Sequence, residues 1–190
     1  MKNIFRYLKN YSTQPFEVDR LIVSAFLKIN GINIVENLLL LDYSITEKQI
    51  QEWNSLSKFI EIINDEIESF DIEKLIELFE FVISPSDRII NGAIYTPSDI
   101  RNYIVNESLN RENVNLNTVQ IADIACGCSG FLYTSASELK RRTNNTYQYI
   151  FANQIFGLDI QEYSVTRSKL LLSLLALSDG EDIEEFHFNI

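Results

Sequence analysis

The chain has 190 residues, of which 46% are hydrophobic and 23% are charged, a balance that supports one or two folded domains and excludes wholesale disorder. No apolar run approaches the roughly 20 residues of a membrane-spanning helix, and the first residues lack the apolar block of a secretory signal, so we expect a soluble cytoplasmic protein with no membrane partner. The net charge is −11, with 9 basic and 15 acidic residues in positions 1–90 and 7 basic and 12 acidic in positions 91–190, so neither half has the basic excess typical of a nucleic-acid-binding domain.

The first part of the chain predicts a helical domain over residues 1–87. Apolar residues recur there at spacings of three and four, which places them on one face of a helix. The expected helices are 18–29, 34–41, 53–67 and 72–82. Asp71 is a predicted N-cap for the last of them, and Pro85 is expected to follow its end because the residue before a proline avoids helical torsions.

After Pro85 the pattern changes to alternating helices and strands, which predicts a second domain over residues 88–190. Thr96-Pro97-Ser98-Asp99 is a helix start with a hydroxyl N-cap and a proline at the first helical position, and this helix should reach residue 109. Further helices are expected at 131–142 and 162–177, strands at 118–124 and 154–158, and the opening of a third strand at 186–190, with a lengthened loop at 142–148. Strands that alternate with helices indicate an α/β fold with a parallel sheet.

The sharpest chemical signal is the turn between the first strand and its helix. Gly127 and Gly130 let the backbone approach a ligand closely, and Asp123 and Asp159 stand at the ends of the two strands. A carboxylate after the second strand can accept both vicinal hydroxyls of a ribose, so a cofactor that contains a nucleoside is expected. The dinucleotide pattern G-x-G-x-x-G is absent, since residues 127–132 read G-C-S-G-F-L, and a cofactor without phosphates fits better.

Three motifs in order resemble a known enzyme family. Residues 123–132, D-I-A-C-G-C-S-G-F-L, resemble the S-adenosylmethionine motif D-P-A-C-G-S-G-x-F-L of the amino-group DNA methyltransferases. Residues 92–97, G-A-I-Y-T-P, resemble the G-x-Y-Y-T-P element of the N6-adenine enzymes of restriction-modification systems, and residues 157–160, G-L-D-I, resemble their G-x-D-I element. The resemblance implies an N-terminal helical domain, like that of type I modification subunits, before a partial Rossmann-like methyltransferase sheet.

The resemblance also implies a role for each site residue toward S-adenosylmethionine. Tyr95, Thr96 and Pro97 would border its methionine end, where a helix N-terminus also presents free N–H groups to a carboxylate. Asp123 would face the ammonium group, Ala125 and Gly127 would line the cofactor through their backbone, Asp159 would accept the ribose hydroxyls, and Ile160 would lie against the adenine.

The chain departs from the family pattern at two important places. Ser129 stands where the second glycine is expected, so either a serine occupies a strained positive φ or the turn shifts to use Gly130. The catalytic N-P-P-Y element is absent, because the three prolines follow Gln14, Ser84 and Thr96. We therefore expect no catalytic residue in this chain, which is interpreted as an inactive fragment of a longer enzyme. DNA would be bound through regions outside it, with a specificity or restriction subunit and a second copy of the chain as further expected partners.

Other interpretations stay open. The chain can be a helical and Rossmann-like interaction module that binds no cofactor, or part of a methyltransferase that acts on RNA or protein, and adenine N6 is not separated from cytosine N4. Cys126 and Cys128 are interpreted as turn residues, because tetrahedral zinc needs four ligands and no metal site is expected. Lys140, Arg141 and Arg142 are interpreted as residues that favour a helix C-terminus, rather than as phosphate ligands.

Overall fold

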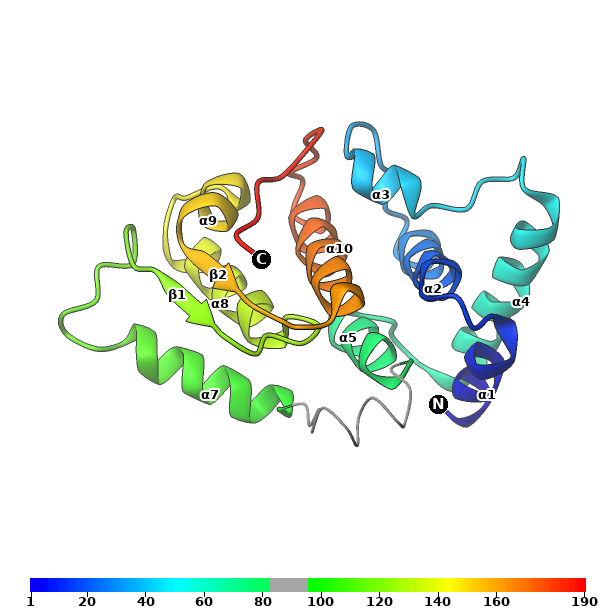
Figure 1. The fold of residues 1–190 in the computed structure, drawn as a ribbon, viewed down its shortest axis with the longest axis horizontal. Coiled ribbons are helices and arrows are strands. Elements are labelled where there is room, and N and C mark those ends of the chain that lie inside the picture. Colours follow the sequence, from blue (N-terminus) through cyan, green and yellow to red (C-terminus); the bar gives the residue numbers. More distant parts are fainter. Residues whose placement is uncertain (83–95) are drawn as a thin grey trace. The chain divides into compact units, whose positions relative to one another are not determined.

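The computed structural model describes residues 1–82 and 96–190, and the chain divides into two compact units, Met1–Gly92 and Ala93–Ile190 (Figure 1). The predicted helix stop at Ser84-Pro85 and most of the G-A-I-Y-T-P motif, Tyr95 included, lie outside the described residues. No helix in these two stretches is long and apolar enough to cross a membrane.

The first unit is built from helices throughout its described part. They are α1 (Lys2–Tyr11), α2 (Pro15–Ile29), α3 (Leu38–Asp42), α4 (Ile50–Glu66) and α5 (Ile72–Phe81). The predicted helices at 18–29, 53–67 and 72–82 are confirmed, and the Asp71 carboxylate caps α5 by accepting a hydrogen bond from the Lys74 backbone N–H at 2.9 Å. The helix predicted at 34–41 starts later, because the side chain of Asn37 caps it by accepting from Leu40 N at 3.0 Å.

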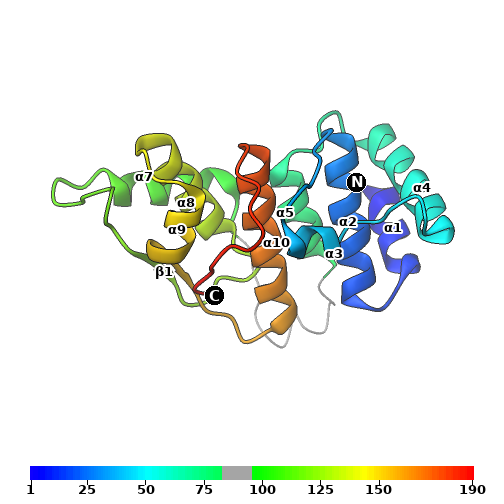
Figure 2. The ribbon, with the colours of Figure 1, turned by 90° about the horizontal axis from the view of Figure 1, so that it is seen from above.

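The core of the first unit lies where the apolar faces of α1, α2, α4 and α5 meet. Its fully buried side chains include Ile4, Leu8, Leu21, Phe59, Ile63, Leu75 and Phe79. Seen from above in Figure 2, α1 lies beside α4, and the ring of Tyr7 stacks on Phe59 at 5.4 Å between centroids. This packing buries one side of α1 and leaves its other side to solvent.

The second unit combines a small parallel sheet with helices. Its elements are α7 (Ser98–Leu109), β1 (Ile121–Asp123), α8 (Gly130–Arg142), α9 (Tyr147–Asn153), β2 (Ile155–Gly157) and α10 (Glu162–Ser178). The strands β1 and β2 run parallel, with Ile121 opposite Ile155 and Asp123 opposite Gly157, and Figure 1 shows both arrows pointing the same way. The predicted α/β arrangement is therefore present, although helices dominate and the described sheet has two strands.

Three expectations for the second unit need correction. The stretch predicted as a loop at 142–148 leads into α9, whose start is capped by the Thr146 hydroxyl accepting from Tyr149 N at 3.1 Å. The predicted third strand is a single parallel bridge between Phe156 and Asn189. Helix α7 begins one residue late, because the carbonyl of Pro97 accepts the first helical bond, from Arg101 N at 3.0 Å, so that Pro97 and not Thr96 is the N-cap.

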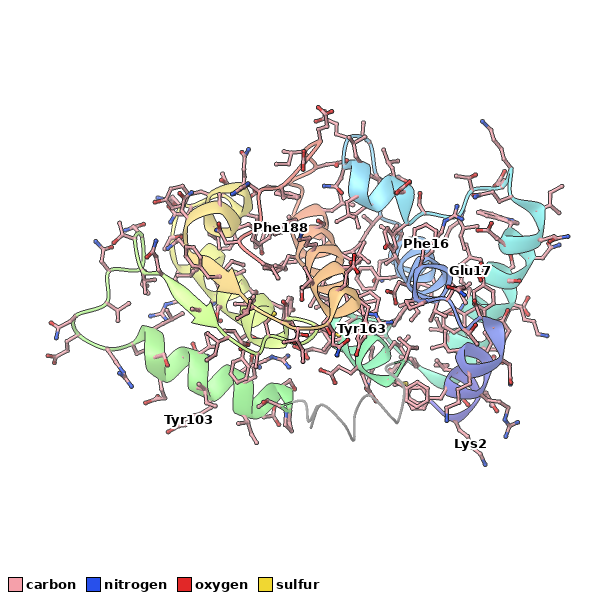
Figure 3. The ribbon with its side chains drawn as sticks, in the orientation of Figure 1. Lys2, Phe16, Glu17, Tyr103, Tyr163 and Phe188 are labelled. Atoms are coloured by element: carbon pink, nitrogen blue, oxygen red, sulfur yellow. The ribbon has the colours of Figure 1, made fainter. Side chains whose placement is uncertain are left out.

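The core of the second unit packs α10 and α9 against the sheet and α8. The leucines of α10 from Leu170 to Leu177 are buried, as predicted. An aromatic cluster joins α9 to the end of the chain through Tyr147, Phe151, Phe186 and Phe188, the last labelled in Figure 3. Asn189 makes further hydrogen bonds to the backbone there. Its carbonyl accepts from Gly157 N at 2.8 Å, and its side-chain amide donates to Ala152 O at 2.9 Å.

Candidate functional site

The candidate site lies where the carboxyl ends of β1 and β2 meet. Asp123 and Gly157 face each other as the last paired residues of the two strands. The ladder continues past them, since Leu158 N donates to Asp123 O at 2.9 Å and Cys126 N donates to Leu158 O at 3.0 Å. The chain after β1 is thus folded back over the end of β2, which brings the glycine turn next to residues 158–160.

The turn itself contains two residues with a positive φ, Gly127 and Ser129. Gly127 has φ +54°, and Ser129 has φ +65° and ψ +32°, which is the left-handed region that a residue with a side chain occupies at a cost of about 1–2 kcal/mol. The prediction that position 129 requires a positive φ is confirmed, and the alternative that the turn shifts to Gly130 is wrong, because Gly130 is the first residue of α8. Ser129 is buried, and its hydroxyl has no hydrogen-bond partner among the described residues.

Asp159 and Ser168 hold this turn from the other side. One carboxylate oxygen of Asp159 accepts from Gly127 N at 3.0 Å, and the other accepts from Gln161 N at 2.8 Å. The Ser168 hydroxyl, on α10, lies 3.0 Å from Gly127 O. The N–H of Gly127 is therefore fixed by Asp159, and its carbonyl shares the single hydroxyl hydrogen of Ser168 with the Ser164 carbonyl, which lies 2.8 Å away.

A buried arginine ties the start of α7 to the same turn. The guanidinium of Arg101 donates to Thr134 Oγ1 at 2.8 Å and to the carbonyl of Thr96 at 3.3 Å. A Cβ atom on Gly130 would lie 3.1 Å from Arg101 Nη1, so glycine at this position makes room for the arginine. Sequence reasoning missed Arg101; its available signal was a glycine in a regular helix, where no special torsion requires one.

The structure thus brings together most of the residues that the sequence singled out. Asp159 contacts the turn directly, whereas Thr96 and Pro97 are linked through Arg101 to Thr134 of α8, the helix that follows the turn. Ala125 donates its N–H to Asp123 Oδ1 at 3.1 Å. Ile160 follows Asp159 and is 83% exposed, which leaves an apolar side chain open to solvent at the edge of the site. Tyr95 lies outside the described residues.

Open space adjoins Asp123. A hollow of about 490 Å³ lies between α7, β1 and α8. Its lining is mostly apolar and includes Ile104, Leu109, Phe131 and Leu132, with Asp123 and Ile124 at one end. Tyr103 of α7 points outward in Figure 3. The carboxylate of Asp123 is therefore part of the lining of a mostly apolar hollow, where it can meet a ligand of mixed polarity.

The two cysteines of the turn are packing groups. Cys126 and Cys128 are both buried, and burial raises the pKa of the Cys126 thiol. The described part of the chain contains no cluster of side chains that could hold a metal ion. The turn therefore offers backbone groups and carboxylates to a ligand, and no thiolate.

The basic residues at the end of α8 have partners within the second unit. Lys140 pairs with Glu181, Arg141 pairs with Glu138 at 2.6 Å, and Arg142 donates to the side chain of Asn110 at 2.7 Å. These contacts support the interpretation of the three residues as a helix C-terminus.

Comparison with known proteins gives one finding. The family model described as N-6 DNA Methylase matches residues 71–184, which is more than half of the chain and includes all the described site residues. No curated protein and no solved structure matches the sequence.

Proposed function

The chain belongs to the N-6 DNA methylase family, and from this premise we propose that residues 88–190 form the S-adenosylmethionine-binding part of an adenine-specific DNA methyltransferase of a restriction-modification system, preceded by a helical domain over residues 1–87. The observation that carries the proposal is the convergence of Asp123, Gly127 and Asp159 at one end of two parallel strands. In open parallel sheets this end is where ligands bind.

The groups at the site fit the cofactor in chemistry. Two carboxylates at neighbouring strand ends suit an ammonium group and a pair of ribose hydroxyls, and the exposed Ile160 suits a flat apolar base. The carboxylate of Asp159 already accepts two backbone N–H groups. A carboxylate has about four acceptor positions, so Asp159 retains capacity for vicinal hydroxyls.

In this proposal the chain's own residues bind and orient the cofactor. Asp123 attracts the ammonium group from the lining of the hollow, the backbone of Ala125 and Gly127 lines the ligand, and the first turn of α7, which starts at Ser98 after Thr96 and Pro97, offers free N–H groups to a carboxylate. Bound S-adenosylmethionine would supply a methyl group attached to a positively charged sulfur, so that an amine can bond to the methyl carbon while the sulfur leaves as a neutral thioether. Fixing the ligand at several points lowers the entropic cost of that displacement.

The group that grips the target amine is not among these residues. The sequence has no N-P-P-Y element, because its three prolines follow Gln14, Ser84 and Thr96. We therefore expect the chain to bind S-adenosylmethionine but to transfer no methyl group by itself, with DNA recognition by a specificity subunit or another part of the enzyme.

A second candidate function is an interaction module that no longer binds cofactor. One observation favours it: both oxygens of Asp159 already accept backbone N–H groups, one from Gly127 in the turn and one from Gln161 before α10, as in a structural carboxylate. Under this alternative, the turn would serve packing alone.

Calorimetric titration of the 190-residue chain with S-adenosylmethionine separates the two functions. The proposal expects saturable heat, which Asp159→Ala and Ile160→Ser both weaken by tenfold or more, because each removes one contact to the nucleoside. Ile50→Ser is the matched control, since Ile50 is also an exposed isoleucine, 70% accessible, in the first unit. Absence of heat from the folded wild-type chain, or equal weakening by Ile50→Ser, would support the interaction module.

A further inference from the structure

The exposed side of α1 concentrates positive charge in an acidic protein. Lys2, Arg6 and Lys9 recur at spacings of four and three, so they lie on one face of the helix, and α1 contains no acidic residue. Lys58 of the neighbouring α4 joins them across a shared hollow. All four are exposed, and Figure 3 shows Lys2 pointing outward from α1. We call these four residues the basic face.

Two hollows flank Arg6 on this surface. One, of about 580 Å³, is lined by Lys2, Phe5, Arg6, Lys9, Asn10 and Phe81. The other, of about 520 Å³, has Arg6, Lys58 and the amides of Asn3 and Asn10 among its lining residues. Neither hollow contains a carboxylate, so a ligand that enters them meets ammonium, guanidinium and amide groups but no negative charge.

The four cations of the basic face form no ion pair with any described residue, whereas two other cations of the first unit do. Arg20 pairs with Glu52 at 2.6 Å, and Lys74 pairs with Glu77 at 2.8 Å. The ammonium groups of Lys9 and Lys58 instead lie near aromatic rings, 5.4 Å from Phe81 and 6.0 Å from Tyr7. The basic face thus keeps its charge available in a chain whose net charge is −11.

An extended polyanion is the ligand that this arrangement suits. Lys2 and Lys9 are seven residues apart on a helix, or about 10 Å along its axis. One strand of duplex DNA presents a phosphate about every 3.4 Å along its axis, so such a stretch faces about three phosphates. Phe5 and Phe81, which both line one hollow, stack on each other with ring centroids 3.7 Å apart. Because each ring already has a stacking partner, contact with the backbone of a duplex is favoured over stacking on unpaired bases.

A lipid surface fits the basic face less well than duplex DNA does. A helix that binds membranes buries an apolar side among the lipids, in addition to its cations. On α1 the apolar side is already occupied, because Ile4 and Leu8 are 0% and 2% exposed in the core of the first unit.

We propose that the basic face binds the phosphate backbone of duplex DNA and positions the substrate of the methyltransferase. The choice of DNA rests on the proposed function, whereas the location and charge of the surface do not. The contacts carry no base readout, so they hold the duplex without selecting its sequence.

The test is binding of the full chain to a fluorescent DNA duplex, without cofactor, followed by anisotropy at several salt concentrations. Arg6→Ala/Lys9→Ala removes two phosphate contacts, so the slope of log affinity against log salt should fall in magnitude by about 2, and affinity at about 50 mM salt should fall at least tenfold. The matched control is Lys28→Ala/Lys48→Ala, which removes the same charge from two exposed sites of the same unit outside the basic face and should leave the slope unchanged. Circular dichroism confirms that both variants fold.

Three results would overturn the proposal: no binding of the wild-type chain to the duplex, an equal loss in both double variants, or binding to phosphatidylserine vesicles in place of DNA. The calorimetric titration is independent of this test. Cofactor binding without DNA binding would remove only the basic face from the mechanism, and DNA binding without cofactor binding would remove only the cofactor site.

Discussion

The basic face of α1 and the glycine turn after β1 are the two surfaces that we propose bind ligands, and they are built in opposite ways. On α1 the ligand groups are exposed side chains on a regular helix, and Ile4 and Leu8 bury the other side. In the turn the ligand groups are backbone atoms, held in place by Asp159, Ser168 and a serine with positive φ. Substitutions on α1 should therefore change binding with little effect on stability, whereas substitutions around the turn should change both.

The largest expected effect tests the support of the turn. Arg101→Met removes charged hydrogen bonds to Thr134 and to the Thr96 carbonyl and should destabilise the second unit by about 3 kcal/mol. Urea unfolding followed by circular dichroism measures this loss. The single tryptophan, Trp53, lies in α4 of the first unit, so its fluorescence should keep the wild-type transition.

The exposed Arg111 gives the control for that variant. Arg111→Met should stay within about 0.5 kcal/mol of wild type, as surface substitutions usually do. An equal effect of the two substitutions would mean that Arg101 does not support the turn.

A smaller loss is expected at Gly157, at the end of β2. A Cβ atom there would lie 2.9 Å from Leu132 Cδ1 and 3.2 Å from Cys126 Sγ. Gly157→Ala should therefore cost about 1–3 kcal/mol through overpacking. Because Leu132 makes the closest contact, the cost of Gly157→Ala should shrink when it is introduced into Leu132→Ala, and additive free energies in the double-mutant cycle would contradict this account.

Substitution of the strained serine should stabilise the protein, unlike the substitutions above. Ser129→Gly removes both the left-handed strain and a buried hydroxyl without a described partner, and it should raise the free energy of unfolding by about 1 kcal/mol. Ser135→Gly, in the middle of α8, should instead lower it by about 1 kcal/mol, as glycine does inside a helix. Thermal melting of the two variants should move the midpoint in opposite directions, and a fall for both would exclude strain at position 129.

The smallest effect concerns pH and the start of α1. The terminal amino group of Met1 and the backbone N–H of Asn3 donate to the Glu66 carboxylate and hold its pKa below the usual value of 4.5. A folded-state pKa below the unfolded one stabilises the protein above about pH 4.5, and this stabilisation is lost as the pH falls through the lower value. Glu66→Gln should therefore flatten the acid side of a stability profile followed by Trp53 fluorescence, and an unchanged profile would assign the acid dependence to other carboxylates.

Much of this fold follows from local sequence. The spacing of apolar residues predicts α4 and α5, because each buries one face, whereas α2, α8 and α10 follow from apolar content between glycine, proline and other turn residues. The missing second glycine left two alternatives, a strained Ser129 or a turn shifted to Gly130, and only the structure decides between them in favour of a positive φ at Ser129. Helix α9 was missed since its polar start resembles a loop, although Thr146 is a hydroxyl in the N-cap position.

Contacts between distant residues were not predictable in the same way. The bond from Gly127 N to Asp159 depends on the register of β1 and β2, and the bond of Arg101 to Thr134 depends on how α7 packs on α8. The basic face was hidden for another reason: charge counted over half of the chain averages the three cations of α1 with the many carboxylates of α4 and α5. Net charge therefore says little about a surface of one helix.

Asn189 has a consequence for aggregation. Its carbonyl accepts the N–H of Gly157, and its side chain holds the carbonyls of Phe151 and Ala152, so one residue occupies backbone groups of β2 and of the end of α9. An uncovered strand edge is a template on which another chain can pair. Asn189 covers one backbone N–H of that edge, and its loss would leave this group open to pairing with another chain.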